Sequence, residues 1–456
     1  MREFVDGLLD EIVRKCNLCA NCIRGCPTFR SSSLGDTDPV DLQTKRIAFV
    51  RDHVFDKDVM TFSKNCSNCG SCKKMCPVGV DPFYLNLFCA YSARKMDRSV
   101  YLDFIKRNRK MWDLPQYSYN NAQVMRSVQK RPSEIPWMSK VPETPNQKNV
   151  VWVTGCYSAK QCNEGLTSYN ILQYIVPNGD FAAIGDMEYC CGLPNLRVGD
   201  LEGAETDGRR FVDDAKKFRP NKVVTGCVAC LWMYKRAYPW LNISFMPQHY
   251  SQFLADNLSK LKPLFRNRVD MAVTIQDPCR FGRQCEDPYA FEAPRRVLRE
   301  IAGLELVEMK HNREDALCCG DMTRFQGGEP GVYEAIAMMR VEEAKETGAE
   351  AIVTLCGGCM ASFLHQTSSH KMQVIDFGIL VGKAIGIEHE DKIAKYKSYK
   401  PDIERVLTEA NECINASPYT TDEMRKVLPM ILGWQEMRYM GNMLQHVHWK
   451  EGEREA

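Results

Sequence analysis

The chain has 456 residues, which at roughly 150 residues per domain predicts about three domains. Its 60 Lys and Arg residues nearly balance 58 Asp and Glu residues, and the resulting net charge of +2 argues against a nucleic-acid-binding protein or a polybasic membrane binder. No apolar run approaches the ~20 residues of a membrane span, and the N-terminus lacks the apolar stretch of a secretion signal. We therefore expect a cytoplasmic chain whose 22 cysteines stay reduced and bind metal rather than form disulfides.

Two cysteine motifs with the same spacing come first along the chain. They are CNLCANCIRGCP and CSNCGSCKKMCP, both of the form C-x2-C-x2-C-x3-C-P. Two such motifs are typical of a pair of cubane 4Fe-4S clusters, in which the fourth cysteine of each motif ligates the other cluster. The predicted ligands are Cys16, Cys19, Cys22 and Cys76 for one cluster, and Cys66, Cys69, Cys72 and Cys26 for the other. Zinc sites, the alternative, would use C-x2-C pairs separated by a longer loop.

Residues 27–65 separate the two motifs and contain more helix formers than strand formers, most clearly over residues 41–51. A compact bacterial ferredoxin consists mostly of hairpins and has a shorter insert. The long helical insert therefore predicts an α-helical ferredoxin-type domain over residues 1–110, similar to those that conduct electrons in multi-subunit reductases. We expect a linker over residues 111–147.

The next cysteines form an internal repeat of the pattern C...CCG...C-x2-C, with the two copies about 125 residues apart. The first copy contains Cys156, Cys190, Cys191, Cys227 and Cys230, and the second contains Cys279, Cys318, Cys319, Cys356 and Cys359. Together with the two motifs, the repeats account for 18 of the 22 cysteines. The other four are expected to pack as small buried side chains; they are Cys89, Cys162, Cys285 and Cys413.

Short β-branched runs precede the cysteines in both repeats and indicate buried strands. These runs are residues 150–153, 223–224, 271–275 and 351–354, and amphipathic stretches lie between them at 202–218 and 332–347. The alternation predicts βαβ units and a parallel sheet in each repeat, with the thiols at the carboxyl ends of strands. We thus expect two Rossmann-like cysteine-rich domains, over residues 148–265 and 266–385, in an α+β multidomain chain.

Residues 386–456 are predicted to form a helical C-terminal extension. Thr420 and Glu423 have the spacing of a capping box. Apolar residues then continue in helical register, with a kink expected at Pro429; they are Met424, Val427, Leu428, Ile431, Leu432, Trp434, Met437, Met440 and Leu444. This apolar stripe either covers the chain's own core or contacts another subunit.

The two motifs followed by two complete C...CCG...C-x2-C repeats resemble the family of the D subunit of heterodisulfide reductase over about residues 10–380. They are more loosely similar to cysteine-rich proteins of glycolate oxidase, anaerobic glycerol-3-phosphate dehydrogenase and transmembrane complexes of sulfate reducers. The resemblance implies that each repeat binds a noncubane 4Fe-4S cluster through its five cysteines, which would be the catalytic residues. A disulfide such as that between coenzymes M and B would be cleaved between these clusters, by one electron from each side.

Cations near the thiols are candidate substrate-binding residues because thiol products are anionic. Lys160, Arg280 and Arg283 lie beside predicted ligands in the sequence, although surface charge is the alternative explanation. Arg280 also stands where we would expect a histidine from the family pattern. The histidines are scattered and predict no ligand set; those considered are His249, His311, His365 and His370.

The sequence contains neither a P-loop nor a G-x-G-x-x-G fingerprint, so electrons must come from a partner protein. By the resemblance, that partner would be a membrane cytochrome b or a quinone-interacting protein of an anaerobic respiratory complex, which would hold the chain on the cytoplasmic face of the membrane. Three functions stay open: a disulfide reductase, a purely electron-transferring subunit, and the iron-sulfur subunit of a glycolate or glycerol-3-phosphate dehydrogenase. The completeness of both repeats counts against the third.

Overall fold

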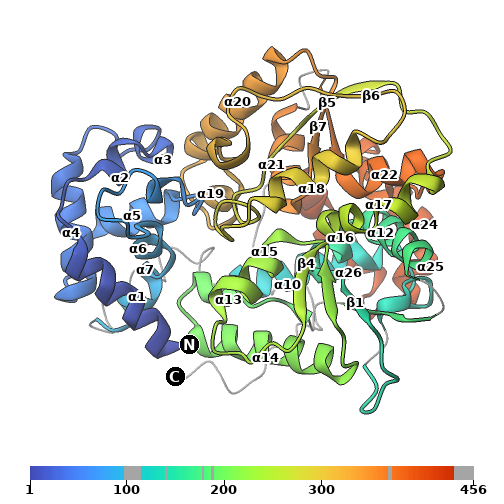
Figure 1. The fold of residues 1–456 in the computed structure, drawn as a ribbon, viewed down its shortest axis with the longest axis horizontal. Coiled ribbons are helices and arrows are strands. Elements are labelled where there is room, and N and C mark those ends of the chain that lie inside the picture. The colour runs from blue at the N-terminus through green and yellow to red at the C-terminus, as the bar shows by residue number, and fades with distance from the viewer. Residues whose placement is uncertain (97–113, 139–140, 177–178, 186–188, 368–371, 436–456) are drawn as a thin grey trace.

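The computed structural model describes residues 1–96, 114–138, 141–176, 179–185, 189–367 and 372–435 (Figure 1). This part of the chain folds into an N-terminal helical domain, two α/β domains and a C-terminal helical module. The predicted α+β multidomain class is confirmed. No helix among the described residues is long and apolar enough to cross a membrane.

The N-terminal domain, drawn in blue in Figure 1, packs through a shared hydrophobic core against the first α/β domain. Its helices are α1 (Arg2–Lys15), α2 (Asn21–Arg24), α3 (Pro27–Arg30), α4 (Pro39–Arg51), α5 (Lys57–Asn65), α6 (Phe83–Leu87) and α7 (Cys89–Arg94). Asp38 starts α4 by accepting a hydrogen bond from the Val40 amide at 2.9 Å, and Asp56 caps α5 in the same way. The insert between the motifs is therefore helical, as predicted.

The first α/β domain has a parallel sheet of four strands in the order β2-β1-β3-β4. The strands are β1 (Val150–Val153), β2 (Phe181–Ile184), β3 (Lys222–Thr225) and β4 (Met246–His249). The helices are α11 (Gly155–Lys160), α12 (Cys162–Ile175), α13 (Leu193–Arg197), α14 (Leu201–Lys217), α15 (Val228–Trp232), α16 (Tyr250–Asp256) and α17 (Leu258–Leu261). All the strand pairs are parallel, which confirms the predicted βαβ architecture.

The second α/β domain repeats this topology in the order β6-β5-β7-β8. Its strands are β5 (Met271–Ile275), β6 (Leu304–Leu306), β7 (Ala351–Thr354) and β8 (Gln373–Asp376). Its helices are α18 (Tyr289–Leu298), α19 (Asp321–Phe325), α20 (Pro330–Glu346), α21 (Gly357–Thr367) and α22 (Phe377–Ile385). The internal cysteine repeat in the sequence is thus a repeat of the fold.

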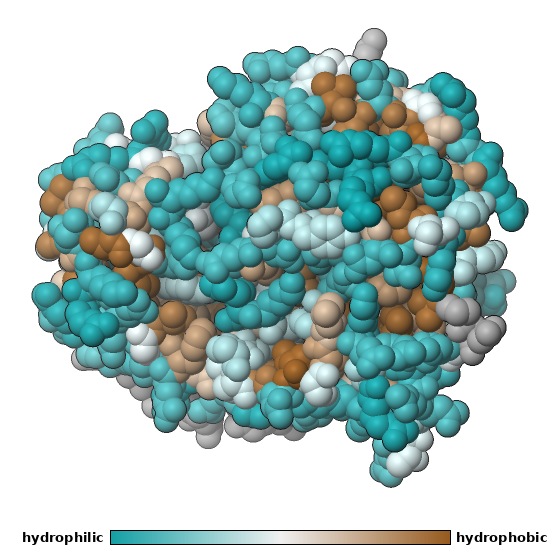
Figure 2. All heavy atoms as spheres, viewed as in Figure 1, coloured by the Kyte–Doolittle hydropathy of each residue, from teal (hydrophilic) through white to brown (hydrophobic). Residues whose placement is uncertain are grey.

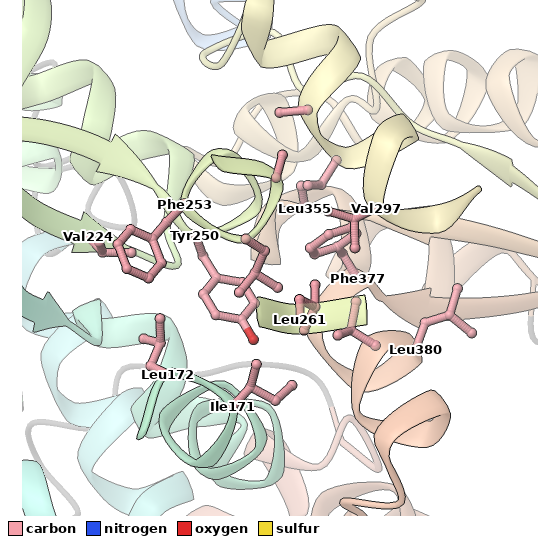
Figure 3. Close-up of a cluster of buried hydrophobic side chains, with 14 of the residues drawn as sticks. Ile171, Leu172, Val224, Tyr250, Phe253, Leu261, Val297, Leu355, Phe377 and Leu380 are labelled. Atoms are coloured by element: carbon pink, nitrogen blue, oxygen red, sulfur yellow. The ribbon is translucent and has the colours of Figure 1, made fainter. Parts of the chain in front are cut away.

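A continuous hydrophobic core joins the two α/β domains (Figure 3). Tyr250 and Phe253 of α16 share this core with Val297 of α18, and Ile171 of α12 shares it with Leu380 of α22. Because protein interiors are close-packed, this shared core fixes the position of one sheet relative to the other. On the face shown in Figure 2, hydrophilic residues predominate and hydrophobic ones are scattered in small groups.

The C-terminal module consists of α23 (Lys392–Ser398), α24 (Ile403–Glu409), α25 (Asn411–Asn415) and α26 (Thr421–Ile431). It packs with α10 (Leu114–Ser127), which lies in the predicted linker segment, around a small core of its own. The capping box at Thr420 and Glu423 is present and Pro429 lies inside α26. Met424, Val427 and Leu428 are fully buried, so this part of the apolar stripe covers the chain's own core. Met437, Met440 and Leu444 lie outside the described residues.

A buried ion pair stabilises the loop that carries Cys279. The fully buried guanidinium of Arg295 donates to both carboxylate oxygens of Asp277, at 2.7 and 2.9 Å, and also pairs with Glu308. Asp277 in turn accepts a hydrogen bond from the Arg313 amide at 2.7 Å. The sequence Asp277-Pro278-Cys279 is thereby fixed at the end of β5.

Replacing Arg295 by Met should lower the free energy of unfolding by about 3–5 kcal/mol, because the buried Asp277 carboxylate loses its partner. An anaerobic guanidinium titration measures the change. Arg296→Met, which removes an exposed arginine from the neighbouring position, is the control and should change it by no more than about 0.5 kcal/mol. Equal effects of the two substitutions would contradict a stabilising role of the buried pair.

Candidate iron-sulfur centres

The two four-cysteine motifs have the same backbone conformation. Cys16 ends α1 and Cys66 ends α5. The loops that follow have positive φ angles at equivalent positions, Leu18 and Ala20 in the first motif and Asn68 and Gly70 in the second. Left-handed residues turn a chain sharply, so each loop folds its first three thiols around one space.

The cysteines of the two motifs line two neighbouring cavities in the N-terminal domain. One cavity is lined by Cys16, Cys19, Cys22 and Cys76. The other is lined by Cys26, Cys66, Cys69 and Cys72, with Cys22 also at its wall. The fourth cysteine of each motif therefore faces the cavity formed by the other motif, and the structure brings together the two sets of thiols that the spacing predicts.

The chemistry of these cavities fits the predicted clusters. Burial raises the pKa of the Cys26 thiol to about 12 and also raises that of Cys72, so these thiols favour the neutral form unless a cation replaces the proton. None of the described residues that line the two cavities is a carboxylate. Within the described ranges, no set of three or more Cys, His, Asp or Glu side chains could hold one metal ion.

The five cysteines of the first repeat gather at the carboxyl ends of β1 and β3. Hydrogen bonds from Cys190 and Cys230 lower the pKa of Cys191, and a hydrogen bond from Cys230 lowers that of Cys227. Burial raises the pKa of Cys156 to about 12. Gly155, beside Cys156, lies against the same group, because a Cβ there would lie 3.4 Å from the Sγ of Cys230.

Glycine follows the cysteine pair for a steric reason. Gly192 has a φ of +79°, and a Cβ there would lie 2.6 Å from the carbonyl oxygen of Ala204. Gly320 occupies the equivalent place in the second repeat, with the same φ, and a Cβ there would lie 2.8 Å from the carbonyl oxygen of Tyr333. Both cysteine pairs therefore precede a left-handed turn that only glycine fits easily.

The second repeat has the same arrangement. Hydrogen bonds from Cys318 and Cys359 lower the pKa of Cys319 to about 6. Burial raises the pKa of Cys279 to about 11, and the charge of Cys356 adds to this rise. The five thiols of each α/β domain thus interact in the same pattern.

A shared cavity wall and electrostatic interactions between thiols link the four sites in a row. A hydrogen bond with Cys318 raises the pKa of Cys69, and Cys318 lines the same cavity as Cys69. The pKa of Cys356 is lowered by Cys359, and the charge of Cys227 in the first repeat opposes this shift. The row therefore runs from the two N-terminal cavities to the second repeat and then to the first.

The three predicted substrate-binding cations have different surroundings. Arg280 is buried over the ring of Trp232, at 5.5 Å, and its Nε and Nη2 have no hydrogen-bond partner in the described part of the chain. Lys160 is half-buried, and its charge opposes the raised pKa of Cys156. Arg283 donates to the carbonyls of Cys69 and Glu314, so its side chain joins two domains.

Residues without a sequence signal also lie near the thiols. Arg197 of α13 is buried, its pKa is lowered to about 10 by burial, and the charge of Cys66 opposes this shift. Gln43 and Arg46 of α4 reach the first cavity. Motifs could not identify these side chains, because they are distant in sequence from the cysteines that they approach and only the fold brings them together.

The four histidines named from the sequence do not form a ligand set among the described residues. His249 caps α16, and burial lowers its pKa to about 3. It faces the backbone at Gly226 and Leu355, the residues that precede Cys227 and Cys356. His311 pairs with Glu343 at 2.9 Å. The side chain of His365 and the whole of His370 lie outside the described residues.

The remaining cysteines are buried and line neither N-terminal cavity. Cys89 donates to the Met60 sulfur at 3.3 Å, Cys162 lies near the Ala159 carbonyl at 3.7 Å, and Cys285 donates to the Arg280 carbonyl at 3.2 Å. Cys413 is also buried.

Comparison with known proteins agrees with this division of the chain. A 4Fe-4S dicluster domain matches residues 12–80, and a cysteine-rich domain matches residues 150–235 and 273–363. The D subunit of the dihydromethanophenazine:CoB–CoM heterodisulfide reductase of Methanosarcina acetivorans is 25% identical over 82% of this chain and 94% of the relative. The corresponding protein of Methanosarcina barkeri is 24% identical over the same shares. The B subunit of the fumarate reductase (CoM/CoB) of Methanothermobacter marburgensis is 25% identical over 76% of this chain and 66% of the relative.

Replacing Cys69 by Ala should remove about four iron atoms per chain, because a 4Fe-4S cluster loses one of its four thiolates. Cys89→Ala, which removes a buried cysteine of the same domain that lines neither cavity, is the matched control and should keep all its iron. Iron and acid-labile sulfide are measured after anaerobic purification. Full iron in Cys69→Ala, or equal losses in both variants, would contradict the assignment.

Proposed function

We propose that this chain, an iron-sulfur protein related to the D subunit of heterodisulfide reductase, is the electron-transferring and disulfide-reducing component of an anaerobic respiratory complex. The observation that carries the proposal is the row of thiol sites. Two four-cysteine sites of the ferredoxin type lead, through the contact between Cys69 and Cys318, to two five-cysteine sites whose Cys356 and Cys227 interact. A row of this kind can deliver electrons singly to a place between two final sites.

The reaction consumes two electrons and two protons for each disulfide, R–S–S–R′, and yields the thiols RSH and R′SH; its reverse forms the disulfide. Cubane and noncubane 4Fe-4S clusters, held by the 18 thiolates named above, would supply the one-electron steps. A disulfide of the kind formed by coenzymes M and B is the proposed substrate, because relatives with that activity align over most of both chains.

The protein's own side chains would bind and shield the substrate. Arg280 carries a buried charge with two unpartnered nitrogens beside both repeats, so it can attract a developing thiolate. Lys160 lies near Cys156 and offers a second positive charge.

A partner protein would exchange electrons with the N-terminal sites. We infer a cytochrome b or a quinone-interacting protein in the membrane, which would hold this chain at the cytoplasmic face. The alternative is that the chain only transfers electrons and uses no thiol substrate.

A thiol test distinguishes these functions. Adding the thiol of coenzyme M or coenzyme B to the oxidised protein should produce a new paramagnetic signal, because a thiol bound beside a five-cysteine site would change the electronic state of the iron-sulfur group held there. Electron paramagnetic resonance measures the signal, and Cys227→Ala, which alters the first repeat, should abolish it. The absence of any thiol-dependent signal from iron-replete protein would contradict disulfide chemistry and favour a purely electron-transferring role.

The order of the row gives a second prediction. In Cys359→Ala the first repeat should become reduced much more slowly than in the unmodified protein, because electrons must pass through the second repeat. In Cys230→Ala the second repeat should still be reduced at the normal rate. Freeze-quench spectroscopy after mixing with a low-potential reductant measures both rates. Equal slowing in the two variants would contradict the proposed order.

A further inference from the structure

Gln43 and Arg46 of α4 are two buried polar side chains between the N-terminal cavities. Each is 2% exposed. Gln43 lines the cavity of Cys16, Cys19, Cys22 and Cys76, and Arg46 lines the neighbouring one. Neither belongs to a cysteine motif, and the proposed electron transfer does not by itself require them.

Gln43 donates a hydrogen bond to a predicted ligand. Its Nε2 lies 3.3 Å from the Sγ of Cys16. Its Oε1 accepts a hydrogen bond from Nη1 of Arg46 at 2.6 Å. Because the guanidinium can only donate, Arg46 fixes the orientation in which the amide of Gln43 presents its NH2 group to the sulfur.

Arg46 is held rigidly between the two cavities. Its Nη2 donates to the Pro82 carbonyl at 3.0 Å and to Oδ1 of Asn86 at 3.1 Å, and its guanidinium lies 5.1 Å from the centre of the Phe62 ring. Nη1 also lies 3.9 Å from the Sγ of Cys22. The position of this charge is thus fixed by the backbone and side chains of α6 and its neighbours.

The charge of Arg46 has no carboxylate partner among the described residues, where no ion pair includes it. A buried cation without a counter-ion is costly. The cavity that Arg46 lines is walled by cysteines, and the Sγ of Cys22 lies 3.9 Å from its Nη1. The thiolates of the cavities are therefore its natural counter-charge.

We propose that Gln43 and Arg46 are positioning residues that raise the reduction potential of the cluster on Cys16, Cys19, Cys22 and Cys76. Reduction adds a negative charge, and both a hydrogen bond to the sulfur and a nearby cation stabilise the reduced form. The inference rests on the cluster assignment and is independent of any thiol substrate. It implies that this site accepts electrons from the partner more readily than its cysteines alone would allow.

The test is a redox titration of the full-length protein followed by electron paramagnetic resonance. Gln43→Leu should shift the midpoint potential of one cubane cluster downward and leave the other clusters unchanged. Gln43→Glu should shift it further downward, because a carboxylate replaces the donor. Arg46→Gln, which removes the charge between both cavities, should lower the potentials of both cubane clusters.

Arg51→Gln is the matched control, since Arg51 lies on the same helix, is exposed and, among the described residues, forms its ion pair with its neighbour Asp52. It should leave every midpoint potential unchanged. A purely structural role of the pair would change iron content or stability without moving the potential. If Arg46→Gln loses iron, Arg46→Lys and the two Gln43 variants still test the proposal, because they keep the buried positive charge. Midpoint potentials equal to those of the unmodified protein in iron-replete Gln43→Leu and Gln43→Glu would overturn the proposal.

Discussion

The interface between the N-terminal domain and the second repeat is the constraint on which the arrangement of the sites depends, because it brings Cys69 and Cys318 to the wall of one cavity. Buried hydrogen bonds lie at this interface. Ser67 and Thr323 share one at 2.7 Å, and Gln326 donates to the carbonyl of Cys66 at 2.8 Å. Buried polar groups are costly when they lose their partners. These directional hydrogen bonds therefore fix the position of the N-terminal domain relative to the second repeat more strictly than an apolar contact alone would.

Spacing and periodicity predicted those parts of the molecule that are local in sequence. The C-x2-C-x2-C-x3-C-P motifs predicted which thiols share a cavity, because three of the four cysteines lie on one loop and the proline directs the fourth away. The β-branched runs predicted the strands, because a buried parallel strand requires a continuous apolar run. The capping box at Thr420 predicted the start of α26 for a similarly local reason.

Features that depend on packing between domains could not be predicted in this way. Nothing in the two repeats indicates which of them brings a cysteine to the N-terminal cavities, since their cysteine patterns are equivalent. Both repeats pack against the N-terminal domain, the first through a shared hydrophobic core and the second through the hydrogen bonds of Thr323 and Gln326. Arg283 lies beside Cys279 in sequence but bonds to the carbonyl of Cys69, more than 200 residues away. Arg46 and Arg197 carry no motif, and their role near the thiols arises only from the fold.

Three buried arginines, Arg46, Arg197 and Arg280, lie beside thiols at successive points of the row. Each has at least one nitrogen without a partner in the described part of the chain. Negative groups nearby, such as thiolate-held clusters, would stabilise these buried charges.

The most direct measurement is the metal content of the full-length protein purified without oxygen. The account predicts about 16 iron atoms and as many sulfide ions per chain, for four 4Fe-4S clusters. A colourless protein, or one that contains only zinc, would contradict it.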